Sequence, residues 1–500
     1  MPRSRSLFNQ ASWIFAGKAS GFLVAFWIPI ILVRLLSPEQ FGGYKQFFLV
    51  SMTIVSALPL GLEASLFYFM PGDRKNAATY FRQTALTLFV MGALAGLVLV
   101  ALAEPLARLL NAPIVAALAP ALAIYVLFEI GGQLLAFTVV IERQSGLAAL
   151  VFLLSDVARA AALVIPVWVT GELFWLGVGA AAYAVLRSIG LVAWGLWTFR
   201  DVPSKAFDTE LLKGQIRYAL PFGASTFLDE GLRRFHQFFV SASFSPALFA
   251  VYSVGLHELA PVTMFFSSLF DVVMVRMSEL FAEDGQLSEI RRLWARMLSG
   301  QALLVVPLFV ILWALAPEFI VGLFTEQYVD SVPVFRVALF TLLLTMVNDH
   351  AVLRSCALTG FIFKATAVGL LASLVAVPAL AAVFGLPGAA GGFVAGWAVA
   401  KGLGLWRICK RIELPLQKAL PWGALLRYGA AAAAVSLAVS PTKGLFEGPL
   451  VTFFFTGGLF WVVYGVVVWA GRLAPVEDRE LLGRALAPFR SRFEKLRGHA

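Results

Sequence analysis

The chain has 500 residues, of which 60% are apolar and 14% are charged, and its formal net charge is +10. A water-soluble chain of this length carries about a quarter of its residues as charged side chains, so this composition, with a mean hydropathy of +0.85, excludes a soluble globular protein. Each membrane-spanning helix needs about 20 predominantly apolar residues, because its backbone polar groups must be satisfied within the segment. The chain contains many such segments and is expected to be a polytopic helical membrane protein.

Apolar runs between charged or turn-rich breaks predict fourteen transmembrane helices, at residues 12–33, 44–70, 83–103, 118–141, 147–169, 174–198, 217–242, 247–275, 297–316, 333–353, 361–384, 388–408, 421–440 and 449–470. The first run is too long for a signal-peptide core and lacks a small-residue cleavage pattern after it, so we expect it to be retained. Short breaks, such as TGEL at 170–173 and FGLPG at 384–388, predict antiparallel hairpins.

One short motif occurs at two corners between predicted helices, as LLSPEQFGGY at residues 35–44 and as SFSPALFAVY at residues 243–252. Each copy has a Ser-Pro pair, an aromatic residue three positions after the proline and a tyrosine three positions later, at an offset of 208. Six crossings separate the corners, so both are expected on the same side of the membrane. A weaker echo relates residues 107–126 to 321–340. The pattern predicts a six-helix unit duplicated in parallel.

We therefore expect an all-α polytopic membrane protein of about 14 transmembrane helices, with two parallel-related six-helix lobes around a central cavity. The predicted amino-terminal lobe is residues 1–200, the carboxy-terminal lobe is 201–412, and an additional helix pair occupies 413–471. Residues 472–500 form a basic tail with apolar residues at helical spacing, which is typical of a helix lying on anionic lipid. A solvated basic tail is the alternative.

The distribution of lysine and arginine between alternate loops predicts the orientation. The loops on one side hold only Arg34, Lys45, Arg108, Arg336 and Lys443, whereas those on the other side hold a several-fold excess of positive charge. Positively charged loops remain in the cytoplasm, so both termini are expected there.

Charged side chains inside the predicted helices are the candidates for function, because a charge at a helix centre costs at least about 2.5–3.5 kcal/mol unless it faces water or a partner. The candidate substrate-binding cations of the central cavity are Lys18, Arg159, Arg187, Arg233 and Arg234. The candidates for lining the cavity or coupling to an ion are Glu63, Asp229, Glu230, His257, Glu258, Asp349 and His350. For scattered charges such as Glu129 and Asp271, a structural ion pair is the alternative.

The predicted helix 217–242 carries the highest density of these charges, in the stretch FLDEGLRRFHQFF at residues 227–239. Asp229 precedes Arg233 by four residues and Glu230 precedes Arg234 by four, which is the favourable order for pairing on a helix. Five ionisable groups in eight residues favour a helix that lines an aqueous cavity. Two self-neutralised pairs that only permit membrane insertion are the alternative.

Other motifs indicate packing rather than chemistry. The stretch GKASG at residues 17–21 has the small-xxx-small spacing typical of closely packed membrane helices, with Lys18 between the glycines. Cys356 and Cys409 lie far apart in apolar helices, so neither a disulfide nor a metal site is expected.

The sequence has no Walker loop and no large extramembrane domain, so no catalytic residue, cofactor or enzyme activity is expected.

The basic start of the chain, IILVRLLSPEQFGGYKQFFLV at residues 30–50 and LPLGLEASLFYFMPG at 58–72 resemble the polysaccharide-transport branch of the multidrug/oligosaccharidyl-lipid/polysaccharide exporter superfamily, the Wzx-type oligosaccharide flippases. The two-lobe layout extends the resemblance over about residues 7–410. The predicted number of fourteen helices also resembles the lipid II flippases of that superfamily. In those proteins the last two helices are thought to form a groove for the lipid tail.

The resemblance implies a flippase that moves an undecaprenyl-pyrophosphate-linked oligosaccharide to the outer leaflet of the bacterial inner membrane by alternating access, for surface polysaccharide synthesis. An anionic pyrophosphate needs compensating cations in a water-filled cavity, and the intramembrane arginines supply them. The expected partners are the lipid-linked glycan, membrane lipids, and a polysaccharide polymerase and chain-length regulator, with no nucleic acid. Coupling to a proton or sodium gradient stays open.

The sequence is compatible with three alternatives. One is an ion-coupled exporter of small molecules with the same fold, and a second is a lipid II flippase. A third is a glycan-assembly subunit without transport activity, such as a polymerase or scaffold subunit. A polymerase would be expected to have a large outer loop with paired arginines or acids, and the longest outer loops here, at about 104–118 and 317–332, are short.

Overall fold

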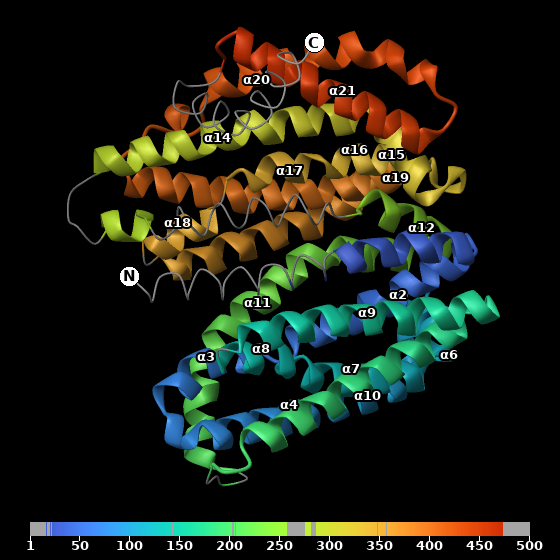
Figure 1. The fold of residues 1–500 in the computed structure, drawn as a ribbon, viewed down its shortest axis with the longest axis vertical. Helices are drawn as coiled ribbons and strands as arrows, with labels where there is room; N and C mark the ends of the chain where they lie inside the picture. Colours follow the sequence, from blue (N-terminus) through green and yellow to red (C-terminus); the bar gives the residue numbers. More distant parts are fainter. Residues whose placement is uncertain are drawn as a thin grey trace, which may run out of the picture. The chain divides into compact units, whose positions relative to one another are not determined.

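The computed structural model describes residues 17, 21, 23–142, 144–202, 205, 207–257, 276–281, 287–347, 349–356 and 358–473 (Figure 1). Over these residues the regular structure is helical and contains no β-strand. The α-helices are Leu23–Leu35, α2 (Pro38–Ala57), α3 (Leu62–Gly72), α4 (Ala77–Ala101), α5 (Ala103–Leu109), α6 (Pro113–Ala117), α7 (Ala119–Gly132), α8 (Leu134–Ile141), α9 (Ser145–Thr170), α10 (Leu173–Thr198), α11 (Thr209–Ser243), α12 (Pro246–Gly255), α14 (Leu287–Ala314), α15 (Ala316–Phe324), α16 (Ser331–Ala338), α17 (Phe340–Thr345), α18 (Asp349–Ser355), α19 (Thr359–Arg411), α20 (Trp422–Val439) and α21 (Pro449–Ala470).

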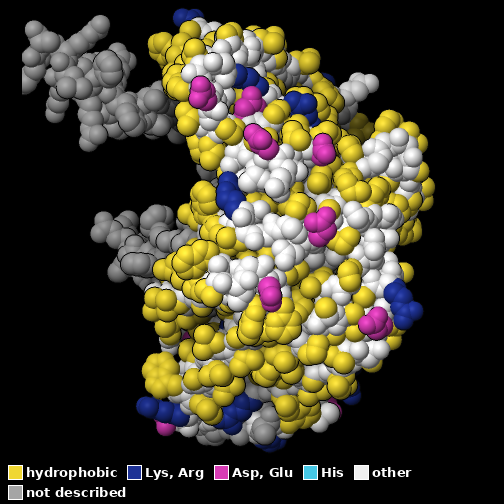
Figure 2. Space-filling view, turned by 90° about the vertical axis from the view of Figure 1, so that its right-hand side faces the viewer, with side chains coloured by type: hydrophobic (Ala, Val, Ile, Leu, Met, Phe, Trp, Pro, Cys, Tyr) yellow, Lys and Arg dark blue, Asp and Glu magenta, His cyan; other side chains and the backbone are white. Residues whose placement is uncertain are grey.

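The described part of the chain contains nine helices that are long and apolar enough to cross a membrane, and three shorter apolar helices. One of the nine spans includes both halves of the α19 hairpin. The polytopic helical fold is therefore confirmed, and the number of fourteen crossings stays a prediction. Apolar side chains cover much of the face drawn in Figure 2, and the lysine, arginine, aspartate and glutamate side chains on it are scattered. Such a surface fits lipid rather than water.

The helices group into two compact units. The first comprises Met1–Ser267 and Ile362–Ala400, and the second comprises Ser268–Phe361 and Lys401–Ala500. Helix α19 contributes to both units, since its residues Ile362–Ala400 belong to the first unit and its two ends belong to the second. The lobe boundaries at residues 200 and 412, the helix pair at 413–471 and the tail at 472–500 stay predictions, and most of that tail lies outside the described residues.

The two Ser-Pro corners have the same local geometry. Ser37 precedes α2 at φ −66° and ψ 162°, and Ser245 precedes α12 at φ −67° and ψ 158°. Each serine hydroxyl caps its helix by accepting a backbone N–H, and each helix begins with the following proline. The capping motif explains why α2 begins at residue 38 instead of the predicted 44, because the cap and the proline's fixed φ favour helix from that point.

The two corners also contact each other. A Cβ atom on Gly42 of α2 would overlap the backbone carbonyl of Pro246 at the start of α12. The repeated motif thus forms one packed contact in the first compact unit, and glycine permits that close approach.

The predicted helix 44–70 is interrupted where the chain passes from α2 to α3. Pro59 cannot donate a helical hydrogen bond, and Leu60 and Gly61 have positive φ angles of 50° and 75°. The carbonyl of Leu60 projects toward Gly223 of α11, where a Cβ atom would overlap it. The interruption therefore gives α11 a close backbone contact with the second predicted span.

Both short breaks noted in the sequence form hairpins. Gly385 is the non-helical residue within α19, at φ 62° and ψ −138°, and Gly369 before it packs against Gly396 after it. Gly171 joins α9 to α10 at φ 72°, and a Cβ atom on Gly179 would overlap the Ala162 carbonyl. The antiparallel hairpins predicted from TGEL and FGLPG are confirmed.

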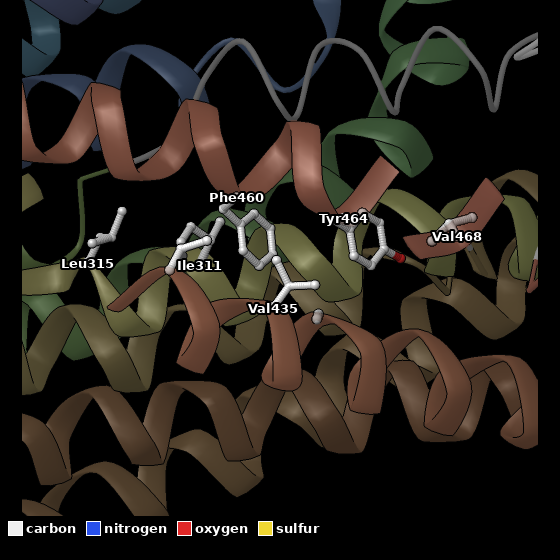
Figure 3. Packing of buried hydrophobic residues seen from close by; sticks show 8 residues of the cluster. Ile311, Leu315, Val435, Phe460, Tyr464 and Val468 are labelled. Atoms are coloured by element: carbon white, nitrogen blue, oxygen red, sulfur yellow. The ribbon is translucent and has the colours of Figure 1, made fainter. Parts of the chain in front are cut away.

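The last two helices pack on α14 in the second compact unit. Figure 3 shows Phe460 and Tyr464 of α21 lying among Val435 of α20 and Ile311 of α14. The rings of Phe460 and Tyr464 are stacked with centroids 5.8 Å apart, and the Tyr464 hydroxyl donates to the Leu303 carbonyl. The pair α20 and α21 is thus an integral part of this unit.

Candidate transport site

Helix α11 carries the polar stretch that the sequence marked as the strongest candidate. Its 35 residues begin at Thr209, eight before the predicted start, because the Asp208 side chain caps the helix by accepting the N–H groups of Glu210 and Leu211. The helix is about 52 Å long at 1.5 Å per residue, which exceeds the roughly 30 Å hydrocarbon core. Its charged stretch lies in the second half.

Both predicted ion pairs on α11 are present. The Nε of Arg233 donates to Asp229 over 2.7 Å, and the Nε of Arg234 donates to Glu230. The pairs differ in exposure: the Arg233 side chain is 45% exposed and the Arg234 side chain is 26% exposed. Arg233 is thus the more accessible cation of the two, although an acid neutralises each.

Two aromatic residues of α19 contact this stretch within the first compact unit. The Arg233 guanidinium lies over the Trp397 ring, 5.0 Å from its centroid. The His236 ring, three residues later on α11, stacks on Phe393 with centroids 4.1 Å apart. His236 is buried, and its Nδ1 is 2.7 Å from the Tyr252 hydroxyl of α12. These contacts fix the rotation of α11 about its axis.

A second group of charges lies in α7, α9 and α10. Arg187 of α10 donates to Glu129 of α7 over 2.5 Å, and Arg159 donates to Asp156 on α9 over 2.8 Å. Both predicted cations are therefore neutralised within the amino-terminal segment. Glu129 is buried, and its Oε2, the Nε atoms of both arginines and the Tyr125 hydroxyl find no hydrogen-bond partner in the described ranges.

The first predicted helix packs closely against this group. A Cβ atom on Gly21 would overlap the Asp156 carboxylate, and one on Gly17 would lie 2.7 Å from the Ala149 Cα. The close packing predicted from GKASG is confirmed. Lys18, between the two glycines, lies outside the described residues.

A third pair lies in the second compact unit. Lys401 of α19 donates to Asp349 of α18 over 2.5 Å, and His350 Nε2 is 3.9 Å from the same carboxylate. Asp349 is buried, and a Cβ atom on Gly404 would overlap its carboxylate. Asp349 and His350 thus belong to a different unit from Arg233.

The remaining candidates are dispersed. Glu63 lies in the first turn of α3, where the helix dipole stabilises a carboxylate, and its buried Oε2 has no hydrogen-bond partner in the part of the chain that the structure describes. The His257 ring follows α12 and lies 4.9 Å from the Phe26 ring. Glu258 and Asp271 lie outside the described residues.

Sequence reasoning missed a buried amide network that holds α11. The side chains of Gln83 on α4 and Gln215 on α11 are hydrogen-bonded over 2.6 Å, and Gln215 also donates to Ser65 of α3 and Thr84 of α4. At the other end of α11, Gln46 of α2 donates to Ser241. The sequence feature that could have indicated these networks is the presence of glutamines within apolar runs. The two networks tie α11 to the amino-terminal helices at both ends.

The arrangement offers ion-pairing and hydrogen-bonding groups rather than a reactive centre. No three His, Cys, Asp or Glu side chains come together as a metal site in the residues that the structure describes. The arginines can bind an anion, provided that their acidic partners release or share them. Arg233 is the best placed for this role, because it combines exposure with a fixed orientation.

Comparisons with known proteins give a consistent result. The family model described as "Polysaccharide biosynthesis protein" matches residues 31–333. The succinoglycan biosynthesis transport protein ExoT of Rhizobium meliloti (strain 1021) is 26% identical over 344 residues, covering 66% of this chain and 65% of that protein. The chain thus spans slightly less than two thirds of that relative's length.

Two solved structures share the fold. The lipid II flippase MurJ in an inward closed conformation has a TM-score of 0.68 at 11% identity, covering 94% of this chain and all of that one. An inward-facing multidrug resistance transporter of the MATE family, described as a member of the MOP superfamily, has a TM-score of 0.66 at 18% identity, covering 80% of this chain and 96% of that one. At these sequence identities, the two similarities show a shared fold and nothing further.

Proposed function

We propose that this chain, which belongs to the polysaccharide biosynthesis protein family, is a flippase for a lipid-linked oligosaccharide used to make a surface polysaccharide. Its multi-pass helical fold is that of the multidrug/oligosaccharidyl-lipid/polysaccharide exporters, whose compared members are transporters and flippases rather than enzymes. The proposed cargo is an undecaprenyl-pyrophosphate-linked glycan, moved from the cytoplasmic to the outer leaflet of the bacterial inner membrane by alternating access.

The observation that carries the proposal is the position of Arg233. It lies ten residues before Ser243, the last residue of α11, and therefore about 15 Å along the helix from that end. This distance is about half the thickness of a hydrocarbon core. Helix α11 is not among the nine long apolar helices of the described residues, and its crossing of the membrane, with Ser243 near the surface, is part of this proposal. A half-exposed cation at that depth would fit a polar path, because a lipid-facing charge would be costly there.

The charge and shape of Arg233 suit the proposed headgroup. A guanidinium can donate two parallel hydrogen bonds to phosphate oxygens, which an ammonium cannot do with the same geometry. We expect the pyrophosphate to share Arg233 with Asp229 while the headgroup passes α11. The cytoplasmic orientation of both termini, coupling to a proton or sodium gradient, and association with a polymerase and chain-length regulator belong to this proposal.

A complementation experiment tests the role of Arg233. In a strain that lacks the gene, Arg233→Ala should abolish surface polysaccharide at normal protein levels, and Arg233→Lys should restore only part of it. Arg200→Ala is the matched control, because Arg200 pairs with Asp201 at a strongly exposed position outside the α-helices. It should complement fully.

The double variant Asp229→Ala/Arg233→Ala separates transport from packing. If the pair is only structural, removing both charges should be tolerated, since no unpaired charge remains. The proposal expects the double variant to be as defective as Arg233→Ala. Wild-type polysaccharide from the double variant at wild-type protein levels would reject the role of Arg233 in transport.

A further inference from the structure

Two aromatic residues of α19 each contact one residue of the polar stretch of α11. Phe393 and Trp397 are four residues apart on α19, with ring centroids 5.9 Å apart. Their partners, His236 and Arg233, are three residues apart on α11 and follow in the opposite order. Two neighbouring helical turns of α19 thus support two neighbouring positions of α11.

Arg233 is held from two directions. Its Nε donates to Asp229 over 2.7 Å, and the face of Trp397 supports the guanidinium at 5.0 Å from the ring centroid. A free arginine side chain has many rotamers, so an arginine that is already oriented loses less entropy when it binds an anion. Arg234 pairs with Glu230, and within the part of the chain that the structure describes no aromatic ring faces its guanidinium.

The support of Trp397 is electrostatic as well as steric. The face of an indole ring attracts a cation, most strongly where water is scarce, and thereby favours a guanidinium in one plane. A guanidinium held flat against the indole ring directs its remaining N–H groups toward a ligand in a constant direction. This geometry suits two oxygens of a phosphate. Leucine at this position would fill part of the space without either effect.

We propose that Trp397 is a positioning residue that orients Arg233 for the pyrophosphate of the lipid-linked substrate. This inference rests on the proposed function and adds to it the residue that sets the affinity of the site for a diphosphate. Trp397 acts through Arg233 and not by contact with the sugar, so its effect should disappear when Arg233 is absent.

The test measures binding to the full-length protein in lipid nanodiscs, with undecaprenyl pyrophosphate as the probe and undecaprenol as the uncharged comparison. Trp397→Leu should weaken binding of undecaprenyl pyrophosphate by about 3- to 10-fold, between the strengths of an exposed and a desolvated cation–π contact, because the Arg233 side chain is 45% exposed. Trp397→Phe should weaken it by no more than about 3-fold, because the aromatic face remains. Binding of undecaprenol should not change.

Trp406→Leu is the matched control. Trp406 lies on the same helix and is also near a cation, Lys410, at 5.7 Å, but it belongs to the second compact unit. This variant should bind undecaprenyl pyrophosphate like the wild type. If Trp397→Leu is not recovered as monodisperse protein, Trp397→Met removes the ring with a side chain of similar volume to leucine.

A double-mutant cycle separates positioning from a general packing role. In the Arg233→Ala background, Trp397→Leu should cause no further loss of affinity for undecaprenyl pyrophosphate. Two outcomes would overturn the inference and leave the proposed function intact. In one, Trp397→Leu lowers the affinity equally in the presence and absence of Arg233. In the other, Trp397→Leu does not change the affinity although Arg233→Ala abolishes binding. A wild-type protein that binds undecaprenyl pyrophosphate no better than undecaprenol would overturn both.

Discussion

Arg187 of α10 donates a 2.5 Å hydrogen bond to Glu129 of α7, and the carboxylate is buried. An offset of 214, which relates residues 107–126 to 321–340, also relates Arg187 to Lys401. Lys401 donates to Asp349, also over 2.5 Å, although Asp349 follows Glu129 by 220 residues and not by 214. Among the described residues, each half of the predicted duplication thus contains an ion pair between its fourth and sixth predicted helices.

The pair Glu129–Arg187 is expected to stabilise the amino-terminal helices. Arg187→Met alone should destabilise the protein by about 3–5 kcal/mol, because it leaves a buried carboxylate without its partner. Glu129→Leu/Arg187→Met should recover most of the loss, since no isolated charge remains. Thermal unfolding of the purified protein in detergent checks both. A double variant as unstable as the single variant would contradict the pairing.

Gly404 should be essential for the second pair. Gly404→Ala places a Cβ atom where the Asp349 carboxylate lies, so it should displace that group from Lys401 and lower the thermal stability. Gly402→Ala, two residues earlier on α19, is the control, because a Cβ atom there meets nothing within 4 Å. Gly402→Ala should be neutral or slightly stabilising, as alanine favours helix over glycine by up to about 1 kcal/mol.

The contact between the two Ser-Pro corners can be tested in the same way. Gly42→Ala should force α2 away from the Pro246 carbonyl and reduce both stability and surface polysaccharide. Gly300→Ala in α14 is the control, since no atom lies within 4 Å of its added Cβ. If Gly42→Ala unfolds at the wild-type temperature and complements fully, the contact between the corners has no structural importance.

The cap of α11 predicts a dependence of stability on pH. The N–H of Leu211 and then the Lys205 ammonium hold the pKa of Asp208 below its usual value of 3.8. A carboxyl group whose pKa is lower in the folded state stabilises the fold above its unfolded pKa and loses that effect as pH falls through the folded value. The stability difference between wild type and Asp208→Ala should therefore be present at pH 7 and shrink below about pH 4. Asp208→Asn, which keeps a cap without a charge, should show a smaller pH dependence in the same unfolding measurement.

The sequence predicted the features that depend on local spacing. The spacing of acid and base by four residues predicted both ion pairs of α11, and the glycines of GKASG predicted a close contact between helices. The short glycine-containing breaks predicted two hairpins. The repeated Ser-Pro motif predicted equivalent corners because a cap and a proline act over one helical turn.

The features that the sequence did not predict depend on tertiary packing. Arg187 and Lys401 find their acids on other helices, 58 and 52 residues away. Trp397 is one of thirteen tryptophans, and its position beside α11 distinguishes it from exposed ones such as Trp168 and Trp469. The interruption at Leu60 and Gly61 was also missed, because a single proline in an apolar run does not show whether a helix bends or ends.

The central claim is that the chain moves a lipid-linked oligosaccharide across the inner membrane, and the access of that lipid to a membrane-impermeant reagent tests it most directly. In cells depleted of the protein, we expect the lipid-linked oligosaccharide to accumulate and to be protected from a glycan-modifying enzyme added outside the inner membrane of spheroplasts. Renewed expression of the wild type should make it accessible within minutes, and Arg233→Ala at equal abundance should not. If the oligosaccharide is equally accessible with and without the protein, the account is wrong.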